Sequence, residues 1–165
     1  MQIRATRASS DREIDLIASR MRLTLIEVLG EEAGTSLYTM EWLRERVRFH
    51  LDPQQCVAAV YVAESDTGEI LAQTIVRIEP ARPCEASQSP EEYGLVSTIY
   101  VVPEARRSGI AERLLAQAES WMGEQGLRRA ATNTGQHNQK LIRLFEKRGY
   151  TISLRSEMVQ LSRAL

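Results

Sequence analysis

The sequence contains few of the residues that mark common functional classes. It has two cysteines, Cys56 and Cys84, without the paired spacing of a zinc or redox site, so we expect no metal and reduced thiols. Basic and acidic residues balance, 21 against 22, so no chain-wide positive field would attract nucleic acid. The longest uninterrupted apolar run, Cys56 to Ala63, is far too short to cross a bilayer. We therefore expect neither nucleic acid nor a membrane as a partner.

The chain also lacks the marks of a targeting segment or of several domains. Residues 1–7 do not have the apolar core of a signal peptide, which predicts a cytoplasmic location. No linker, repeat or low-complexity tract interrupts the sequence, and 165 residues are enough for one domain with a sizeable core. We therefore expect a single domain spanning residues 1–165.

Hydrophobic periodicity, capping residues and glycines predict alternating strands and helices. Strands are expected at residues 3–7, 56–64, 70–78, 93–102, 127–132, 150–154 and 157–161. Helices are expected between Ser10 and Gly30, at 40–50, between Gly109 and Gly126, and at 137–148, with a break at 34–36 and a loop at 79–89. The segment from 93 to 132 reads as a βαβ unit, so its two strands should be parallel with a right-handed crossover.

The most informative segment is the junction between the strand ending at Val101 and the next helix. Arg106-Arg107-Ser108-Gly109-Ile110-Ala111 occupies this turn. A helix N-terminus leaves backbone N–H groups unpaired and carries a partial positive charge. Gly109 has no Cβ, so an anion can approach the backbone closely, and two arginines can neutralise its charge. The turn predicts a pyrophosphate site.

Two common phosphate motifs do not fit this turn. A nucleotide P-loop ends in Gly-Lys-Ser/Thr, and the dinucleotide fingerprint needs three glycines, of which only Gly109 is present here. A nucleotide-phosphate binder is therefore a weaker alternative. A second alternative is that the turn is a basic surface loop capping an ordinary βα unit.

A second motif follows the βαβ unit. Asn138 precedes Leu141, Leu144 and Phe145, and the segment ends in Gly149-Tyr150. Together with the Arg-x-x-Gly-x-Ala turn, this pattern resembles the GNAT superfamily of N-acetyltransferases, most closely over Ser97 to Tyr150. The resemblance implies an α/β fold (α+β by some schemes). Its sheet would be mixed and mostly antiparallel, with six to seven strands flanked by four helices, and the strands at 93–102 and 127–132 would splay apart.

The resemblance also implies acetyl-CoA as co-substrate and no metal. Pantetheine would pair with backbone groups of Ile99, Tyr100 and Val101. The pyrophosphate would lie on the turn formed by Arg106, Arg107, Ser108, Gly109, Ile110, Ala111 and Glu112. Asn138 matches a position whose amide contacts the CoA chain, although capping of its own helix is an alternative role. Two departures are that Ala111 replaces a second glycine and that Glu112 adds a negative charge.

Family chemistry is direct transfer of the acetyl group to a primary amine of a small molecule or a peptide. An alkyl amine has a pKa of about 10, so a base must remove its proton at neutral pH. Leu95 stands where some relatives have a glutamate, which leaves Glu92 as our candidate base, acting through water held by Ser97 or Thr98. The alternative is that Glu92 is a solvated loop residue. A backbone N–H near Val101 would hold the oxyanion.

The usual acid is missing as well. Phe145 stands where many relatives have a tyrosine that protonates the leaving thiolate; the resemblance places its ring among the cofactor contacts, and core packing is the alternative. Because both the usual base and the usual acid are missing, a non-catalytic acyl-CoA-binding sensor or partner module is an alternative function. Because Glu79, Glu85, Glu91 and Glu92 outnumber Arg82 in one loop, we expect a cationic acceptor. The family often dimerises, so a homodimer is expected as a possible state.

Overall fold

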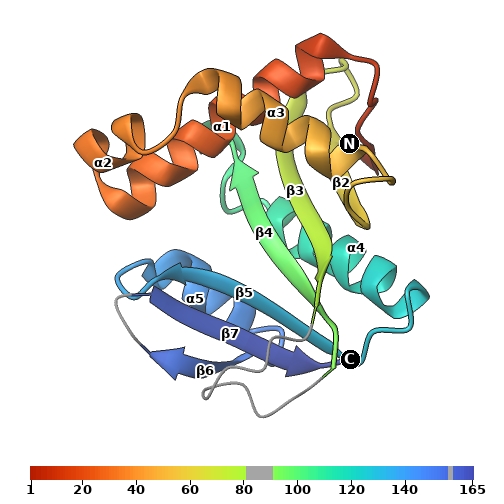
Figure 1. Ribbon diagram of the computed structural model, residues 1–165, viewed down its shortest axis with the longest axis vertical. Helices are drawn as coiled ribbons and strands as arrows, with labels where there is room; N and C mark the ends of the chain where they lie inside the picture. The colour runs from red at the N-terminus through yellow and green to blue at the C-terminus, as the bar shows by residue number, and fades with distance from the viewer. Residues whose placement is uncertain (81–90, 156–157) are drawn as a thin grey trace.

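The computed structural model describes residues 1–80, 91–155 and 158–165, which form one mixed sheet with helices on both faces (Figure 1). The strands are β1 (Gln2–Ala5), β2 (Ala58–Glu64), β3 (Ile70–Glu79), β4 (Tyr93–Val101), β5 (Arg129–Gly135), β6 (Thr151–Arg155) and β7 (Met158–Ala164). The helices are α1 (Asp11–Leu29), α2 (Glu31–Ser36), α3 (Met40–Leu51), α4 (Ile110–Glu124) and α5 (Gln139–Glu146), with a 3-10 turn, η1, at Pro103–Ala105.

The strand order of the sheet is β1-β2-β3-β4-β5-β7-β6. Every described pair of neighbours is antiparallel except β4 and β5, which are parallel and joined through α4. The expected α/β fold, with a mostly antiparallel seven-stranded sheet and one parallel pair, is confirmed.

The helices divide between the two faces of the sheet (Figure 1). On one face α1 and α3 pack on the central strands through buried residues such as Ile17, Leu43 and Ile75. On the other face α4 and α5 cover the sheet through residues such as Leu115 and Phe145. Because strand side chains alternate between faces, each residue of β3 and β4 can be assigned to the α1–α3 face or to the α4–α5 face.

The structure differs from the sequence prediction between α1 and α3. The expected break at residues 34–36 is instead the end of α2, so five α-helices are described where four were expected. Gly34 suggested a helix breaker, but it is needed for close packing: a Cβ at this position would lie 2.5 Å from backbone atoms of Ile26. Within the described residues, no helix is long and apolar enough to span a bilayer.

Buried His50 at the end of α3 predicts a specific pH dependence of stability. Burial, and then the charge of Arg46, lower the pKa of His50 from 6.5 to about 4. In the unfolded chain the His50 side chain therefore becomes protonated near pH 6.5, whereas in the folded protein it becomes protonated only near pH 4. Stability from this group is intact above pH 6.5 and is lost as the pH falls toward 4. At about pH 5 the free energy of unfolding should be lower by about 2 kcal/mol because of this group.

Urea denaturation at about pH 7.5 and about pH 5 measures this loss. The unfolding free energy of His50→Gln should fall less between the two pH values than that of the unchanged protein. His137→Gln is the control, because the His137 side chain is exposed. Equal falls in all three proteins would contradict the assignment.

Candidate functional site

The site is centred on the point where β4 and β5 stop pairing. Gly94–Val96 pair with Ala130–Thr132, and the two strands diverge beyond these residues (Figure 1). The buried hydroxyl of Thr132 donates a hydrogen bond to the carbonyl oxygen of Val96 at 2.9 Å. This bond closes the narrow end of the splay, which we call the vertex.

A β-bulge in β4 lies directly at the vertex. In the pairing of β3 with β4, Ile75 faces Thr98 and Val76 faces Val96, so Ser97 is an extra residue without a partner. The Ser97 side chain is exposed. Because the bulge shifts the alternation by one residue, Ile99 packs on the α4–α5 face like Val96. The vertex therefore has an exposed hydroxyl and a backbone segment outside the ladder.

Beyond the bulge, β4 has one edge paired with β3 and one edge open toward the splay. The N–H of Val102 donates to Leu71 of the segment at the start of β3, at 2.9 Å. Alternate residues of an antiparallel strand point the same way, so Tyr100 also faces β3, while Ile99 and Val101 turn their N–H and C=O groups to the open edge. Of the three residues expected to pair with pantetheine, Ile99 and Val101 are thus placed to do so and the Tyr100 backbone is not.

The turn after β4 has the geometry of an anion site. Arg107 and Gly109 both have left-handed backbone conformations, with φ of 64° and 80°. Such conformations turn successive N–H groups toward one concave surface. Among the described residues, no protein acceptor bonds to the N–H groups of residues 107–112. A Cβ on Gly109 would meet nothing within 4 Å, so the space above it is open.

The charges around the turn differ from the sequence expectation. Arg107 is exposed and forms no ion pair with a carboxylate of the described residues. Arg106, in contrast, interacts with other residues of the protein. Its Nε donates to the Val101 carbonyl at 3.0 Å, and its guanidinium lies 3.5 Å from Glu27. Glu112, expected to oppose the phosphate, lies 3.7 Å from the ammonium of Lys147, which offsets its charge.

Glu27 of α1 connects the two sides of the splay. Besides Arg106 in the turn after β4, it lies 3.9 Å from the ammonium of Lys140 in α5, which follows β5. All three side chains lie on the surface, so each pair contributes little to stability. The sequence could not show this residue's place, because no spacing within α1 indicates what lies across from it.

Asn138 has the capping role that was considered as its alternative. Its side-chain oxygen accepts a hydrogen bond from the N–H of Leu141 at 3.3 Å, which caps α5. Its amide nitrogen donates to the hydroxyl of Thr134 in β5 at 3.0 Å. One amide proton and one oxygen lone pair remain for a ligand. Asn138 therefore fixes the start of α5 against the open part of β5.

Two other expected site residues lie away from the splay. Phe145 is fully buried and packs edge-to-face on Tyr150, with ring centroids 4.8 Å apart. Its ring offers no surface to a cofactor, so core packing is the role that the geometry supports. Glu92 precedes β4 and lies roughly 16 Å from Ser97 along the strand, at about 3.3 Å per residue. The fold does not bring this carboxylate to the vertex.

Some residues at the splay were not singled out from the sequence. Asn133 is exposed on the open part of β5, where its side chain shares the α1–α3 face with Gly135, at which a Cβ would lie 3.2 Å from Val28 of α1. Thr132 closes the vertex, as described above. Polar residues at alternate positions of a strand are too common to be recognised without the fold.

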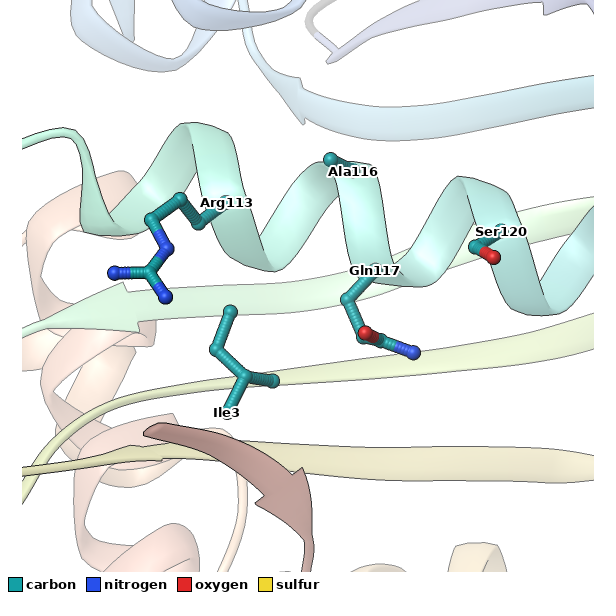
Figure 2. A pocket seen from close by; sticks show the side chains of 5 residues that line it. All are labelled: Ile3, Arg113, Ala116, Gln117 and Ser120. Carbon is teal, nitrogen blue, oxygen red and sulfur yellow. The ribbon is translucent and has the colours of Figure 1, made fainter. Parts of the chain in front are cut away.

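A separate groove of about 480 Å³ lies between β1 and α4. Figure 2 shows Arg113 and Gln117 of α4 extending toward Ile3 of β1. The groove is on the edge-strand side of the sheet and does not adjoin the splay. It gathers no set of reactive groups and is not part of the candidate site.

Comparisons with known proteins agree with this geometry. The model of the acetyltransferase (GNAT) family matches residues 24–150, and the chain therefore belongs to this family. It is similar to an uncharacterised N-acetyltransferase of Bacillus subtilis (strain 168), YhfO, with 34% identity over 68 residues, 41% of this chain and 46% of that protein. The match thus spans about half the length of this curated relative.

Solved structures with low sequence identity share the fold. A chain of the NatC complex bound to Gag peptide and CoA superposes with a TM-score of 0.73 at 18% identity, over 100% of this chain and 99% of that chain. An N-acetyltransferase from Staphylococcus aureus Mu50 has a TM-score of 0.73 at 17% identity, covering 99% and 97%. Ribosomal-protein-alanine N-acetyltransferase from Brucella melitensis has a TM-score of 0.67 at 18% identity, covering all of both chains.

The two hydrogen bonds of Asn138 make a testable prediction about stability. Asn138→Ala removes the cap and the bond to Thr134, and should lower the free energy of unfolding by about 1–2 kcal/mol. Asn138→Asp keeps the capping oxygen and loses only the donor to Thr134, so its loss should be smaller. Urea denaturation at neutral pH measures both.

Ser10→Ala is the matched control, because Ser10 caps α1 by the same kind of bond, to the N–H of Glu13, far from the splay. It should lose about 1 kcal/mol. If Asn138→Ala cost no more than Asn138→Asp, the cap would contribute nothing and the interpretation would fail.

Proposed function

We propose that this protein is an acetyl-CoA-dependent N-acetyltransferase that transfers the acetyl group directly to an amine. The observation that carries the proposal is the continuity between the open edge of β4 and the unpartnered amides of residues 107–112. A cofactor that has both a diphosphate and an amide-bearing arm suits such a site. Coenzyme A is such a molecule, and the family to which the chain belongs supports this choice.

In this arrangement the diphosphate lies on the turn at the start of α4. Backbone N–H groups donate to its oxygens, and the helix dipole and the exposed Arg107 add positive charge. The phosphates would compete with Glu27 for Arg106 and Lys140. The pantetheine arm then runs along Ile99 and Val101 like an added strand, toward the vertex.

The acetyl group would then lie near the bulge and not near Val101. Val101 adjoins the phosphate turn, and its carbonyl is already bonded to Arg106. The N–H of Ser97, the residue without a partner in the ladder, lies at the vertex instead. A preorganised backbone N–H aimed at the developing oxyanion is a large source of rate enhancement. We therefore assign oxyanion stabilisation to the bulge.

Proton transfer does not need the expected side chains. A thiol has a pKa of about 8.5, so the thiolate of CoA can leave without an acid at position 145. General acid–base help is typically worth about 10²–10⁴-fold, and its loss slows the reaction without preventing it. A water molecule on the exposed hydroxyl of Ser97 can carry the amine proton to solvent.

The acceptor is an amine of a small molecule or a peptide. The names of two structural neighbours support an amino group as acceptor, since one acts on a ribosomal-protein alanine and the other is bound to a Gag peptide. The competing function is a non-catalytic CoA-binding module, which Leu95 and Phe145 favour because neither can move a proton. The module would bind CoA as tightly and release no thiol.

Two glycines at opposite ends of α4 test CoA binding. Gly109 and Gly126 are both left-handed, with φ of 80° and 75°, and a Cβ at either would meet nothing within 4 Å. Gly109→Ala and Gly126→Ala should therefore each cost about 1–2 kcal/mol of stability through backbone strain alone. Only Gly109→Ala places a methyl group where the diphosphate approaches, so only it should weaken CoA binding, by about tenfold or more.

Calorimetry with CoA on the folded proteins measures the difference between the two variants. Equal CoA affinity in both would show that the diphosphate does not lie on this turn. Stronger thermal stabilisation by ATP than by CoA would favour the nucleotide-phosphate alternative.

Thiol release from acetyl-CoA across a panel of amines tests catalysis. We expect turnover with at least one amine, and a rate that rises with pH as the amine loses its proton. Ser97→Ala should slow the reaction by removing the hydroxyl that orients water, and Ser120→Ala, on the outer side of α4, is the control. Tight CoA binding with no thiol release from any amine would support the module.

A further inference from the structure

A second cavity, of about 400 Å³, lies on the α1–α3 face near the beginning of β4. Residues of α3, the start of β2, the end of β3 and the segment before β4 line it, among them Arg46, Phe49, Cys56, Arg77, Glu79 and Glu92. Arg77 is directly opposite Leu95 in the ladder. Leu95 is two residues from the bulged Ser97, so the cavity begins about 7 Å from the vertex along β4.

Two arginines, Arg46 and Arg77, line this cavity, and only one of them has a carboxylate partner among the described residues. Arg77 pairs with Glu79. The guanidinium of Arg46 lies over the ring of Phe49 at 4.6 Å and forms no ion pair with a carboxylate of the described residues. Burial, and then the charge of Arg77, lower the pKa of Arg46, so the two cations destabilise one another. A bound anion would relieve this repulsion.

Buried His50 supports Arg77 without adding charge. The Nδ1 of His50 lies 2.7 Å from the carbonyl oxygen of Arg46, so Nδ1 carries the proton and donates it. Nε2 is then an acceptor, and it lies 3.5 Å from Nη1 of Arg77. The Nε of Arg77 is buried and has no acceptor within the described part of the chain. Arg77, which lines the cavity, thus has one buried donor without a partner among the described residues.

We propose that Arg46 and Arg77 bind a carboxylate of the acceptor, so that the enzyme acetylates amines that also carry a carboxylate. This inference rests on the proposed acetyl transfer. CoA held at the start of α4 leaves the α1–α3 face of the vertex for the acceptor. An amine at the bulge with a carboxylate about 7 Å or more away would reach the cavity along β4. Paired hydrogen bonds from guanidinium groups match the geometry of a carboxylate.

The proposal replaces the cationic acceptor expected from the sequence. Glu79, one of the four glutamates behind that expectation, is paired with Arg77. Glu92 is exposed at the edge of the cavity, Glu91 adjoins it in the chain, and Glu85 lies outside the described residues. Of the charged residues that line the cavity, Arg77 and Glu79 pair with each other, which leaves Arg46 and, at the edge, Glu92.

The test compares 6-aminohexanoate with 6-aminohexanamide, which differ only in the carboxylate. Both are assayed for thiol release from acetyl-CoA, with spermidine as a cationic acceptor. The unchanged protein should favour the carboxylate over the amide in kcat/KM by about tenfold or more, since hydrogen bonds to a charged group carry at least that factor. Arg46→Gln and Arg77→Gln should reduce this preference to about twofold or less.

Arg48→Gln is the matched control on α3. Arg48 is exposed, pairs with Asp11 at 3.2 Å and does not line the cavity, so its loss should leave the preference intact. Arg77→Lys keeps the charge but not the planar fork, and should retain part of the preference. It is the variant to use if Arg77→Gln does not fold.

A binding measurement separates this proposal from the proposed function. 6-Aminohexanoate should raise the melting temperature of the CoA complex, and 6-aminohexanamide should not; Arg46→Gln should abolish the shift. Turnover of amines without preference for the carboxylate, or with preference for spermidine, would overturn the carboxylate site and leave acetyl transfer intact. A carboxylate-dependent shift without turnover of any amine would keep the site and reject the enzymatic function.

Discussion

The structure depends on the point at which β4 and β5 stop pairing. Buried or partly buried backbone groups need partners, so a sheet cannot open unless something else satisfies them or they are left for a ligand. Here the Thr132 hydroxyl bonds to the Val96 carbonyl at the last paired position. The bulge at Ser97 then separates the direction of β4 from that of β5. Beyond the bulge the facing edges of β4 and β5 are unpaired, which is what the proposed binding of an extended cofactor requires.

The turn after β4 and the open edge of β4 follow one another directly along the chain. β4 ends beside the turn, and the N–H groups of residues 107–112 have no acceptor among the described residues. Left-handed conformations at Arg107 and Gly109 keep those groups on one side. For Arg107 this conformation is unfavourable, and an observed strain of this kind in a binding turn is typical of a functional constraint. Arg106 joins the turn to β4 through the Val101 carbonyl, so the two parts are held in register.

Local signals allowed much of this to be predicted from the sequence. The turn, the helix cap at Asn138 and the parallel βαβ unit depend on residues close together in the chain, and each was placed correctly. The bulge at Ser97, the bond from Thr132 and the position of Glu27 depend on pairs far apart in sequence, and no spacing shows them. Glu92 and Phe145 were misleading for a related reason, because position along a strand or helix does not say which side chains reach the site. Gly34 was expected to break a helix, but its lack of a side chain instead allows α2 to pack closely on α1.

The charge of the acceptor side also bears on how the amine loses its proton. An ammonium group near two guanidinium groups is destabilised relative to the neutral amine, so its pKa falls and a larger fraction is nucleophilic at neutral pH. The acceptor carboxylate itself, and Glu79 paired with Arg77, would offset this charge, so the arginines would orient the acceptor without lowering the pKa of its amine. Without a carboxylate base at the vertex, the amine proton would leave through water on the exposed hydroxyl of Ser97. An acidic acceptor site would act in the opposite direction, by stabilising the ammonium form, and would need a stronger base than the residues described at the vertex provide.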